Sequence, residues 1–411
     1  MLPVRLSLFI ARRYMQKQKG AFSAFIIRLA IGATALSVTV MIMALAIVTG
    51  FSHAISEKLF SFMGHVHVAL YNETGAVSGG LAQPIYLDPK LLAELRSIPQ
   101  VASVSPYVVT PAIVQAKGQL EGLNLKGVDD SYHFLGGITS YGARIDHSDT
   151  QYSKDIILSK ATAEKLDVSI GDTIQINFID QSTPRIRRVR VCGLYHSGME
   201  EVDKHFAVCD MRLLQRVNNW DKDSINGYQL DLTNAADADS VTTYIHYNLI
   251  DPPLAVNTTA GTYTFIFDWL RLQGSNSAIL IIIMAIVAII NLGAALLILI
   301  IDRAVMIGLL SALGMTFERT RDIFLYIAAI IGGAGILLGN ILALTLCLLQ
   351  ARYGFMKLPE SSYSMKYVPV KVIWWQIALV DVLTLLICVL CMWLPTLYIR
   401  RVQPAKVLQF K

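Results

Sequence analysis

Apolar and polar stretches alternate unequally along this chain. One apolar stretch covers residues 29–51, and more than half of the chain follows it as mixed polar and apolar sequence. Three further apolar stretches then arrive close together, at 278–301, 323–349 and 372–394. Each is long enough to cross a hydrocarbon core of roughly 30 Å as a helix that rises about 1.5 Å per residue. We therefore predict an α-helical membrane protein with four transmembrane helices in a one-plus-three order, and one large inserted domain, the head.

This pattern predicts segments that alternate between the membrane and the water on its two sides. An even number of spans returns both termini to one side, so the head lies on the other. The predicted segments are an N-terminal segment at 1–28, a first span at 29–51, the head at 52–275, a second span at 276–301, an inner-face helix at 302–322, a third span at 323–350, a short outer loop at 351–371, a fourth span at 372–396 and a tail at 397–411.

Basic residues near the span ends indicate the orientation. The two ends of the chain carry Lys and Arg without any acid, and the positive-inside rule places such ends in the cytoplasm. The loop at 351–371 opposes this assignment with four basic residues, but the N-terminal bias usually dominates. The head is therefore predicted to be extracytoplasmic. The basic residues at the two ends are Arg5, Arg12, Arg13, Lys17, Lys19 and Arg28, then Arg400, Arg401, Lys406 and Lys411.

Composition agrees with a membrane protein. Apolar residues make up 54% of the chain, charged residues 16%, and the mean hydropathy is +0.51, beyond the usual range of a soluble domain. The net charge of +5 is explained by the basic ends, so it does not indicate nucleic-acid binding. The segment at 1–28 is predicted to be uncleaved, because its apolar run starts too late for a signal peptide. It could form an amphipathic helix on the membrane surface or serve as a plain basic anchor.

The head is predicted to be a mixed α/β domain. A strand near 83–87, a helix at 91–98 and an alternating strand from Val101 give a β-α-β order. A similar order closes the head, with a strand at 228–232, a helix at 235–248 and a strand at 254–258.

Between these two units lies a strand-rich block, with a strand at 155–158, a helix at 160–166 and a strand at 173–179. We expect one subdomain built from both ends of the head, with a second subdomain inserted in it.

Five cysteines add a modest signal. Cys347, Cys388 and Cys391 fall in apolar spans, where small hydrophobic packing is the default. Cys192 and Cys209 fall in the head, in two strand-like segments joined by a loop. In an oxidising compartment these two could form a disulfide, or they could remain free thiols, because sequence does not show whether they face each other.

Motifs of catalysis and metal binding are missing from the sequence. There is no G-x-x-x-x-G-K-[ST] phosphate loop, no H-E-x-x-H and no G-x-S-x-G. His65 and His67 have the spacing of two ligands on one strand face, but no third ligand is near, so a surface or packed pair is favoured. We predict no metal site and no enzymatic activity in this chain.

Several residues of the spans have more than one interpretation. Gly335 and Gly339 form a G-x-x-x-G in the third span, which could serve packing within the chain or a contact with a second copy. Asn291 and Asp381 are polar groups at membrane depth, with either a functional or a merely hydrogen-bonded role. The link at 301–319 contains a segment rich in helix formers that ends at Gly314, as a short cytosolic lever helix or a plain helical turn would.

Four motifs together resemble one family. They are Asp302-Arg303 with the segment at 307–314, Leu394-Pro395 with the segment at 400–408, the segment at 48–51, and the segment at 193–203. In this order and topology the whole chain resembles the FtsX-like and MacB-like ABC transporter permeases, and most of all the lipoprotein-releasing LolC/LolE family. The resemblance implies a MacB-like periplasmic core with porter-like β-α-β units and a β-rich insertion.

The resemblance also implies the partners. A homo- or heterodimer of permeases would work with a separate ATPase that binds ATP and Mg, so this chain itself would hold no cofactor. The location would be the bacterial inner membrane. Met306 stands where many members carry an acid, so the ATPase contact here would depend on apolar burial. The residues that the resemblance assigns to ATPase coupling are Asp302, Arg303, Ile307, Leu309, Leu310, Leu313 and Gly314.

The family implies an apolar cleft for lipoprotein acyl chains between the first two spans and their outward extensions. Release would pass the lipoprotein to a periplasmic carrier. The short turn near Gln181 has arginines beside it that could dock that carrier or form a solvated strand face. The cleft residues by this resemblance are Phe51, Leu59, Phe60, Phe62, Met63, Phe265, Phe267, Trp269 and Leu270, which could equally form an ordinary interfacial belt.

Two other functions stay open. A MacB-like efflux component would use the same lever to move the head without taking up lipid. An FtsX-like regulator would activate a cell-wall hydrolase by a change of shape. The protein that copurifies would separate these alternatives: a lipoprotein, an outer-membrane channel or a hydrolase.

Overall fold

A computed structural model shows the architecture of the chain. It describes residues 9, 13, 21–71, 83–132, 138–148, 151–178, 185–302, 306, 308–309, 313–358, 365 and 367–391. Contacts divide the chain into two compact units. The helical unit contains Met1–Ser52, Arg271–Lys357 and Tyr367–Lys411, and the head contains His53–Leu270 with Leu358–Lys366.

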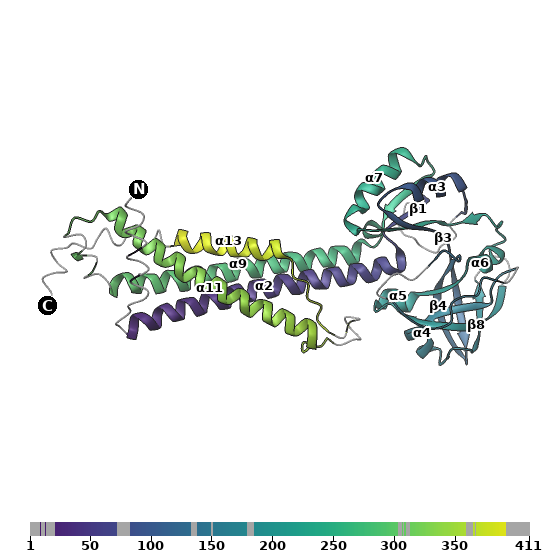
Figure 1. The fold of residues 1–411 in the computed structure, drawn as a ribbon. Coiled ribbons are helices and arrows are strands. Elements are labelled where there is room, and N and C mark those ends of the chain that lie inside the picture. Colours follow the sequence, from purple (N-terminus) through teal and green to yellow (C-terminus); the bar gives the residue numbers. More distant parts are fainter. Residues whose placement is uncertain are drawn as a thin grey trace. The chain divides into compact units, whose positions relative to one another are not determined.

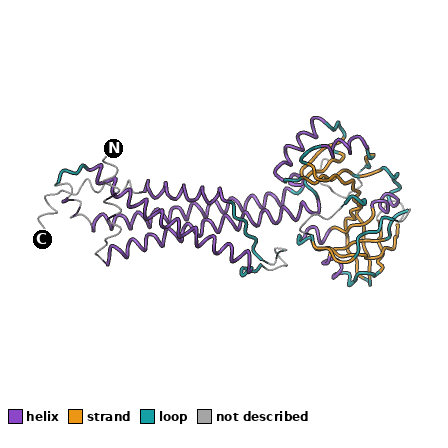
Figure 2. The backbone as a smooth tube through the Cα atoms, viewed as in Figure 1, coloured by secondary structure: helices purple, strands orange, loops and turns teal. Residues whose placement is uncertain are grey.

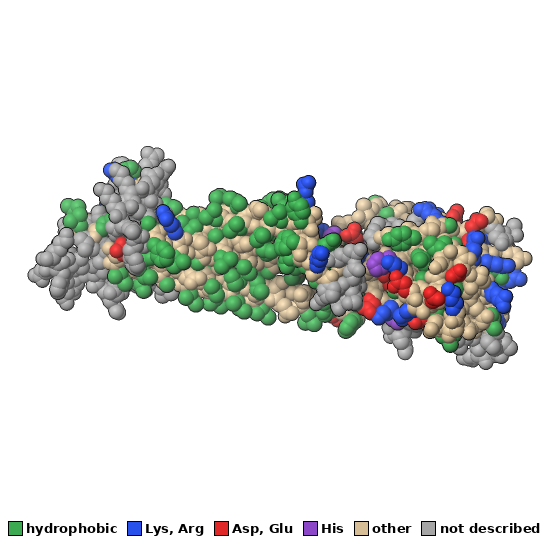
Figure 3. Space-filling view, turned by 90° about the horizontal axis from the view of Figure 1, so that it is seen from below, with side chains coloured by type: hydrophobic (Ala, Val, Ile, Leu, Met, Phe, Trp, Pro, Cys, Tyr) green, Lys and Arg blue, Asp and Glu red, His purple; other side chains and the backbone are tan. Residues whose placement is uncertain are grey.

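Long apolar helices form the helical unit (Figure 1): α2 (Ala21–Met63), α9 (Thr264–Asp302), α11 (Phe317–Tyr353) and α13 (Trp374–Cys391). Within the described residues, three helices are long and apolar enough to cross a membrane, and they belong to α2, α9 and α11. The apolar part of α13 is shorter over the described residues, so the count of four spans stays a prediction. On the face of these helices seen in Figure 3, hydrophobic side chains are numerous and charged ones are few, as on a surface in contact with lipid.

The two glycines of the G-x-x-x-G motif pack against α2 of the same chain. A Cβ added at Gly335 would lie 2.7 Å from the Thr34 Cβ, and one added at Gly339 would lie 2.8 Å from the Ala35 carbonyl oxygen. The Thr39 hydroxyl also donates a hydrogen bond of 3.1 Å to the Gly339 carbonyl. Close approach of two helix backbones therefore explains both glycines, and the intramolecular alternative is confirmed.

The loop after α11 is also held against α2. Gly354 ends α11 in the left-handed conformation, which favours glycine because it has no Cβ. Farther along the loop, the Lys371 amide donates to the Ala46 carbonyl at 3.0 Å. A Cβ on Gly50 would lie 2.6 Å from the Pro369 carbonyl oxygen. The loop and α2 thus touch through their backbones.

A ten-stranded sheet forms the centre of the head, and Figure 2 shows its strands. The strand order is β12-β1-β11-β3-β4-β9-β6-β8-β5, with β7 paired to β3 and β8, and a separate two-stranded sheet joins β10 to β2. The strands are β1 (Val66–Leu70), β2 (Ile85–Tyr86), β3 (Val101–Ala116), β4 (Gln119–Val128), β5 (Thr139–Gly142), β6 (Asp155–Ser159), β7 (Thr173–Phe178), β8 (Arg185–His196), β9 (Phe206–Asp210), β10 (Ser224–Ile225), β11 (Gly227–Leu232) and β12 (Leu254–Thr258).

Short helices connect these strands. Asp88 accepts a hydrogen bond from the Lys90 amide at the start of α3, and Ser159 caps α4 in the same way through Thr162. The helices of the head are α3 (Pro89–Ser97), α4 (Lys160–Lys165), α5 (Glu200–His205), α6 (Met211–Val217), the 3-10 helix η1 (Ala235–Asp237), α7 (Ala238–Asn248) and α8 (Thr259–Thr262).

The closing β-α-β unit is confirmed, whereas the opening one is wrong in its pairing. β11 and β12 both pair antiparallel with β1, so they run parallel on either side of it, with α7 between them in sequence. β2, by contrast, pairs with β10 in the separate sheet and does not join β3, because only two of its residues extend as a strand. β3 pairs with β11 near its start and with β7 near its end, so one strand runs through both predicted subdomains.

Cys192 and Cys209 are buried free thiols, which contradicts the disulfide alternative. β6 lies between their two strands, since it pairs with β8 on one side and with β9 on the other. Two strands separated by a third are about 9–10 Å apart, beyond the Cα separation of about 7 Å that a disulfide tolerates. The two side chains also belong to different hydrophobic clusters.

Candidate functional site

The predicted ATPase-coupling segment exposes its leucines where the structure describes it. Leu309 and Leu313 are 53% and 77% exposed. The Leu313 amide donates to the Leu309 carbonyl at 3.0 Å, which is a helical turn, and Gly314 then adopts a positive φ of 88°. This agrees with a helix that ends at a glycine. Asp302 is exposed at the end of α9, and Arg303, Ile307 and Leu310 lie outside the described residues.

Three of the predicted cleft residues are core residues of the head. Leu59, Phe62 and Met63 are at most 2% exposed, and they pack with Tyr195 and Phe206 in one hydrophobic cluster. The Phe62 ring lies 5.5 Å from the rings of both aromatic partners. The prediction that these three side chains line a cleft therefore fails in this conformation, because they point into the sheet.

The remaining cleft residues of the head form a partly exposed group at the start of α9. Phe60 of α2 stacks on Phe267 of α9 with 5.8 Å between ring centroids. Phe265 is 85% exposed and Trp269 39%, whereas Leu270 is buried. The two helices thus meet through one aromatic pair, with two further aromatic side chains reaching the surface. Phe51 belongs to the helical unit and is partly buried there.

The last turn of α2 is bound to the head by side chains that the sequence did not single out. The Phe62 carbonyl accepts a hydrogen bond of 2.6 Å from the Lys126 ammonium and one of 3.2 Å from the Tyr132 hydroxyl. Gly64 then leaves the helix with a φ of 77°, and its carbonyl accepts from the Thr259 hydroxyl at 2.7 Å. Carbonyls at a helix C-terminus lack helical partners, and these side chains provide them.

Lys126 is a buried cation. It is 3% exposed, and its second hydrogen bond, of 2.7 Å, goes to the Gln229 side-chain oxygen. Its ammonium also lies 4.8 Å from the Phe62 ring centroid and 4.6 Å from that of Tyr132, as cation–π contacts do. Burial lowers its pKa to about 7, and the nearby Asp231 opposes that shift. Sequence gave no signal for this group, since an isolated Lys in a strand is ordinarily solvated.

His65 and His67 do not form a metal site. The His65 Nδ1 accepts a hydrogen bond of 3.1 Å from the Leu232 amide, while the His67 ring is 4% exposed and packs edge-on against Tyr107. Both His67 nitrogens lack a hydrogen-bond partner among the described residues. Burial, with a smaller contribution from the Lys126 charge, lowers the pKa of His67 to about 3. Among the described residues, no three His, Cys, Asp or Glu side chains lie close enough together to hold a metal ion.

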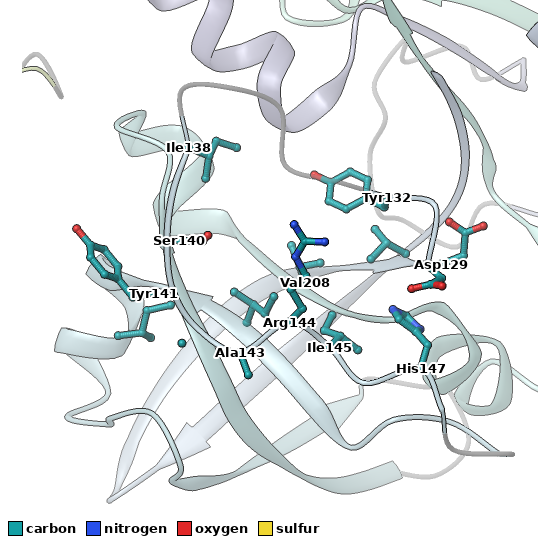
Figure 4. Close-up of a pocket in the computed structure, with 15 residues that line it drawn as sticks. Asp129, Tyr132, Ile138, Ser140, Tyr141, Ala143, Arg144, Ile145, His147 and Val208 are labelled. Carbon is teal, nitrogen blue, oxygen red and sulfur yellow. The ribbon is translucent and has the colours of Figure 1, made fainter. Parts of the chain in front are cut away.

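A pocket of about 170 Å³ lies in the head beside β5, and Tyr132 belongs both to its lining and to the group around the Phe62 carbonyl. Figure 4 shows Asp129, Tyr132, Arg144 and His147 around it, over a floor that includes Val208. Charges of both signs line it, and it contains none of the residues that the sequence predicted for coupling or for the cleft. We assign it no role.

The two polar residues at membrane depth differ in their surroundings. The Asp381 carboxylate of α13 accepts a hydrogen bond of 2.8 Å from the Asn340 side chain of α11, a partner that the sequence analysis missed. Asn291 is exposed on α9. The hydrogen-bonded alternative for Asp381 thus has a partner in Asn340.

Comparisons with known proteins agree along the whole chain. Residues 29–246 match the family described as the MacB-like periplasmic core domain, and residues 278–404 match the FtsX-like permease C-terminal family. A lipoprotein-releasing system transmembrane protein LolC from Xylella fastidiosa is 25% identical, over 99% of both chains. A LolE protein of the same system from Haemophilus influenzae is 22% identical, over 97% of this chain and 98% of its own.

Solved structures match the head at low similarity. The periplasmic region of MacB from Actinobacillus actinomycetemcomitans is 14% identical, and the match covers 49% of this chain and 92% of that region with a TM-score of 0.35.

Proposed function

The chain belongs to the FtsX-like and MacB-like permeases, and from this premise we propose that it is the permease subunit of an ABC transporter that releases lipoproteins. A separate ATPase would hydrolyse ATP. The permease would extract lipoproteins from the outer leaflet of the inner membrane toward a periplasmic carrier, with both of its own termini in the cytoplasm. The similarity to LolC over 99% of both chains is the observation that carries this proposal.

The energetics of the task explain why such a machine needs a motor and an apolar surface. A lipid anchor resists extraction by about 0.8 kcal/mol per buried methylene, so several acyl chains together resist by tens of kcal/mol. An aqueous head can receive these chains only if it offers apolar surface on the way. Phe265 and Trp269 are exposed at the start of α9, among the residues of α9 that belong to the head. They are the cleft residues that an acyl chain can reach without disturbing the core.

The inner-face segment supports a coupling role by its exposed leucines. Leu309 and Leu313 present apolar side chains on a helical turn that Gly314 ends. Burial of such side chains against an ATPase would contribute binding energy without an ion pair. Many members of the family carry an acid at the position of Met306, and this proposal does not require one there.

A second permease would complete the membrane part. In the most apolar 18-residue stretch of α9, 6% of the residues are buried within the chain. In the corresponding stretches of α2 and α11 the share is 44%. An apolar helix that packs so little on its own chain has surface left for a neighbouring permease or for lipid. We propose that α9 faces the second permease, whether identical or related.

Substitution of Phe265 tests the lipoprotein function. Phe265→Asp places a charge on a side chain that is 85% exposed, so the fold should persist. Tyr247→Asp is the matched control, because Tyr247 is an aromatic residue of α7 that is 79% exposed. The assay measures release of a radiolabelled lipoprotein from proteoliposomes to a soluble carrier, alongside ATP hydrolysis.

The expected result is loss of release in Phe265→Asp with ATP hydrolysis retained, and wild-type behaviour in Tyr247→Asp. Unchanged release in Phe265→Asp would refute the assignment of this surface to the acyl chains. Copurification of an outer-membrane channel or of a cell-wall hydrolase, in place of a lipoprotein, would instead support the efflux or the regulatory function.

A further inference from the structure

The end of α2 is attached at the centre of the head's sheet. Lys126 lies on β4, opposite Val109 of β3 and opposite Val208 of β9. β4 pairs with β3 on one side and with β9 on the other, so together with β7, which pairs with β3 and β8, it connects the β12-to-β3 side of the sheet to the β9-to-β5 side. A force applied to the Lys126 ammonium therefore acts on both halves of the sheet at once.

The chemistry at this point is that of a side chain binding a helix end. The Lys126 ammonium donates to the Phe62 carbonyl in the last turn of α2, at 2.6 Å, and to the Gln229 side chain of β11, at 2.7 Å. Both acceptors are neutral, so no full negative charge sits directly on the buried cation. A cation near a helix C-terminus is stabilised by the partial negative charge of the unpaired carbonyls. This explains why a lysine can stand where a core side chain is expected.

The other long helix enters the head differently. α8 ends at Thr262 and α9 begins at Thr264, and the intervening Tyr263 has a φ of −100° and a ψ of 49°, outside the helical range. The Tyr263 side chain makes one weak polar contact with α2, of 3.5 Å to the Met63 sulfur. α9 therefore joins the sheet through a break in the helix, whereas α2 joins it through a buried, hydrogen-bonded end.

We propose that Lys126 is the positioning residue that fixes the last turn of α2 to the sheet, so that displacement of α2 is passed to the head. α2 is one continuous helix from Ala21 to Met63, and it can transmit displacement only if its end cannot slip. This inference rests on the proposed transport function, in which an inner-face motion must reach the head.

A purely structural role for Lys126 predicts something different. A buried cation can often be replaced by an apolar side chain of similar volume without loss of stability. Lys126→Met keeps an unbranched side chain of nearly the same length and removes the hydrogen bonds to Phe62 and Gln229. If Lys126 only fills space, this variant should release lipoprotein like the wild type.

The test uses the full permease in complex with its ATPase, reconstituted in proteoliposomes. Lipoprotein release and ATP hydrolysis are measured for the wild type, Lys126→Met and Lys126→Gln, with Lys90→Met as the control because Lys90 is an exposed lysine of α3. Nitroxide labels at Glu57 of α2 and at Lys90 report the distance between α2 and the rest of the head. Glu57 and Lys90 are both exposed.

We expect Lys126→Met to lose about tenfold in release per ATP hydrolysed, and its label distance to broaden from one narrow population. Lys126→Gln retains one donor for the Phe62 carbonyl and should lie between Lys126→Met and the wild type in both measurements. Lys90→Met should match the wild type in release and in ATP hydrolysis. A narrow label distance in Lys126→Met with wild-type release would overturn the proposal.

The two proposals fail in distinguishable ways. If the wild-type complex hydrolyses ATP and releases no lipoprotein, the proposed function is wrong, while the label distances still test the attachment of α2. If the wild type releases lipoprotein and Lys126→Met does so equally well, the attachment proposal is wrong and the function stands. Loss of ATP hydrolysis together with release in Lys126→Met would also count against it, since the ATPase would then be affected directly.

Discussion

The tight contact between α2 and α11 makes a stability prediction that does not depend on function. We consider Gly339→Ala, which adds one methyl group where the backbone of α2 approaches. That carbon would lie 2.8 Å from both the Ala35 carbonyl oxygen and the Val38 Cβ. Carbon atoms in ordinary contact are about 3.5–4 Å apart, so the helices must separate by roughly 0.7 Å or more.

The magnitude follows from this separation. Overpacking of this kind costs about 1–3 kcal/mol. The Thr39 hydroxyl has one proton and a nearer acceptor in the Ala35 carbonyl, at 2.7 Å, so loss of its 3.1 Å contact with the Gly339 carbonyl adds little to this cost. Alanine in place of glycine favours the helix by about 1 kcal/mol, which opposes these losses. Gly333→Ala should show only this gain in helix stability, because a Cβ on Gly333 meets nothing within 4 Å.

The difference between the two variants is therefore the quantity to measure. We expect Gly339→Ala to be less stable than Gly333→Ala by about 1–3 kcal/mol. Unfolding of the purified protein in mixed micelles with increasing dodecyl sulfate, followed by circular dichroism, gives both values. Equal midpoints for the two variants would show that α2 and α11 are not in close contact, and the glycine motif would then need another partner.

Two further predictions concern the head. Because burial lowers the pKa of His67 to about 3 from 6.5, the unfolded chain binds a proton that the folded head does not, and stability falls as the pH drops from 6.5 toward 3. At pH 5 the free energy of unfolding is lower by about 2 kcal/mol for this reason. Urea unfolding of the wild type and of His67→Phe at pH 7 and pH 5 measures this loss, which His67→Phe should not show. An identical pH dependence in both proteins would contradict the prediction. Burial also raises the pKa of Cys192 to about 11 and that of Cys209 further still. Both thiols should therefore react with iodoacetamide only after denaturation. Rapid labelling of either one in the folded protein would be inconsistent with the structure.

The sequence predicted the elements of the head better than their pairing. Apolar periodicity located α3 and β7, which each have one buried face, and it located part of β3. β6, β11 and β12 were located as short apolar strands, and β6 and β11 are buried at every position. β1 was considered only as a possible strand face for His65 and His67 and was not placed in the fold, since its five residues directly follow a long helix and a glycine. The pairing of β2 with β10 joins segments about 140 residues apart, and no local pattern encodes such a partner.

The candidate site shows the same limit. An aromatic residue after an apolar run fits a cleft, an interfacial belt or a core equally well, and three of the predicted cleft residues are core. The role of Lys126 depends on its hydrogen bonds to the Phe62 carbonyl, 64 positions earlier in the sequence, and to Gln229, 103 positions later. Exposure of Phe265 and burial of Phe62 differ because only one of the two faces the sheet. That depends on tertiary structure and not on residue type.

The contacts of α2 and α9 together suggest which helix drives the head. In the helical unit, α2 touches the glycines of α11 and the backbone of the loop at 369–371, and in the head its last turn is held by Lys126. α9 packs little on its own chain and enters the head through the break at Tyr263. In the proposed transporter, a displacement of the segment before Gly314 would reach α11 directly, because α11 begins just after Gly314. From α11 it would pass to α2 through the close backbone contact, while α9 would bend at Tyr263 and change its contact with the proposed second permease.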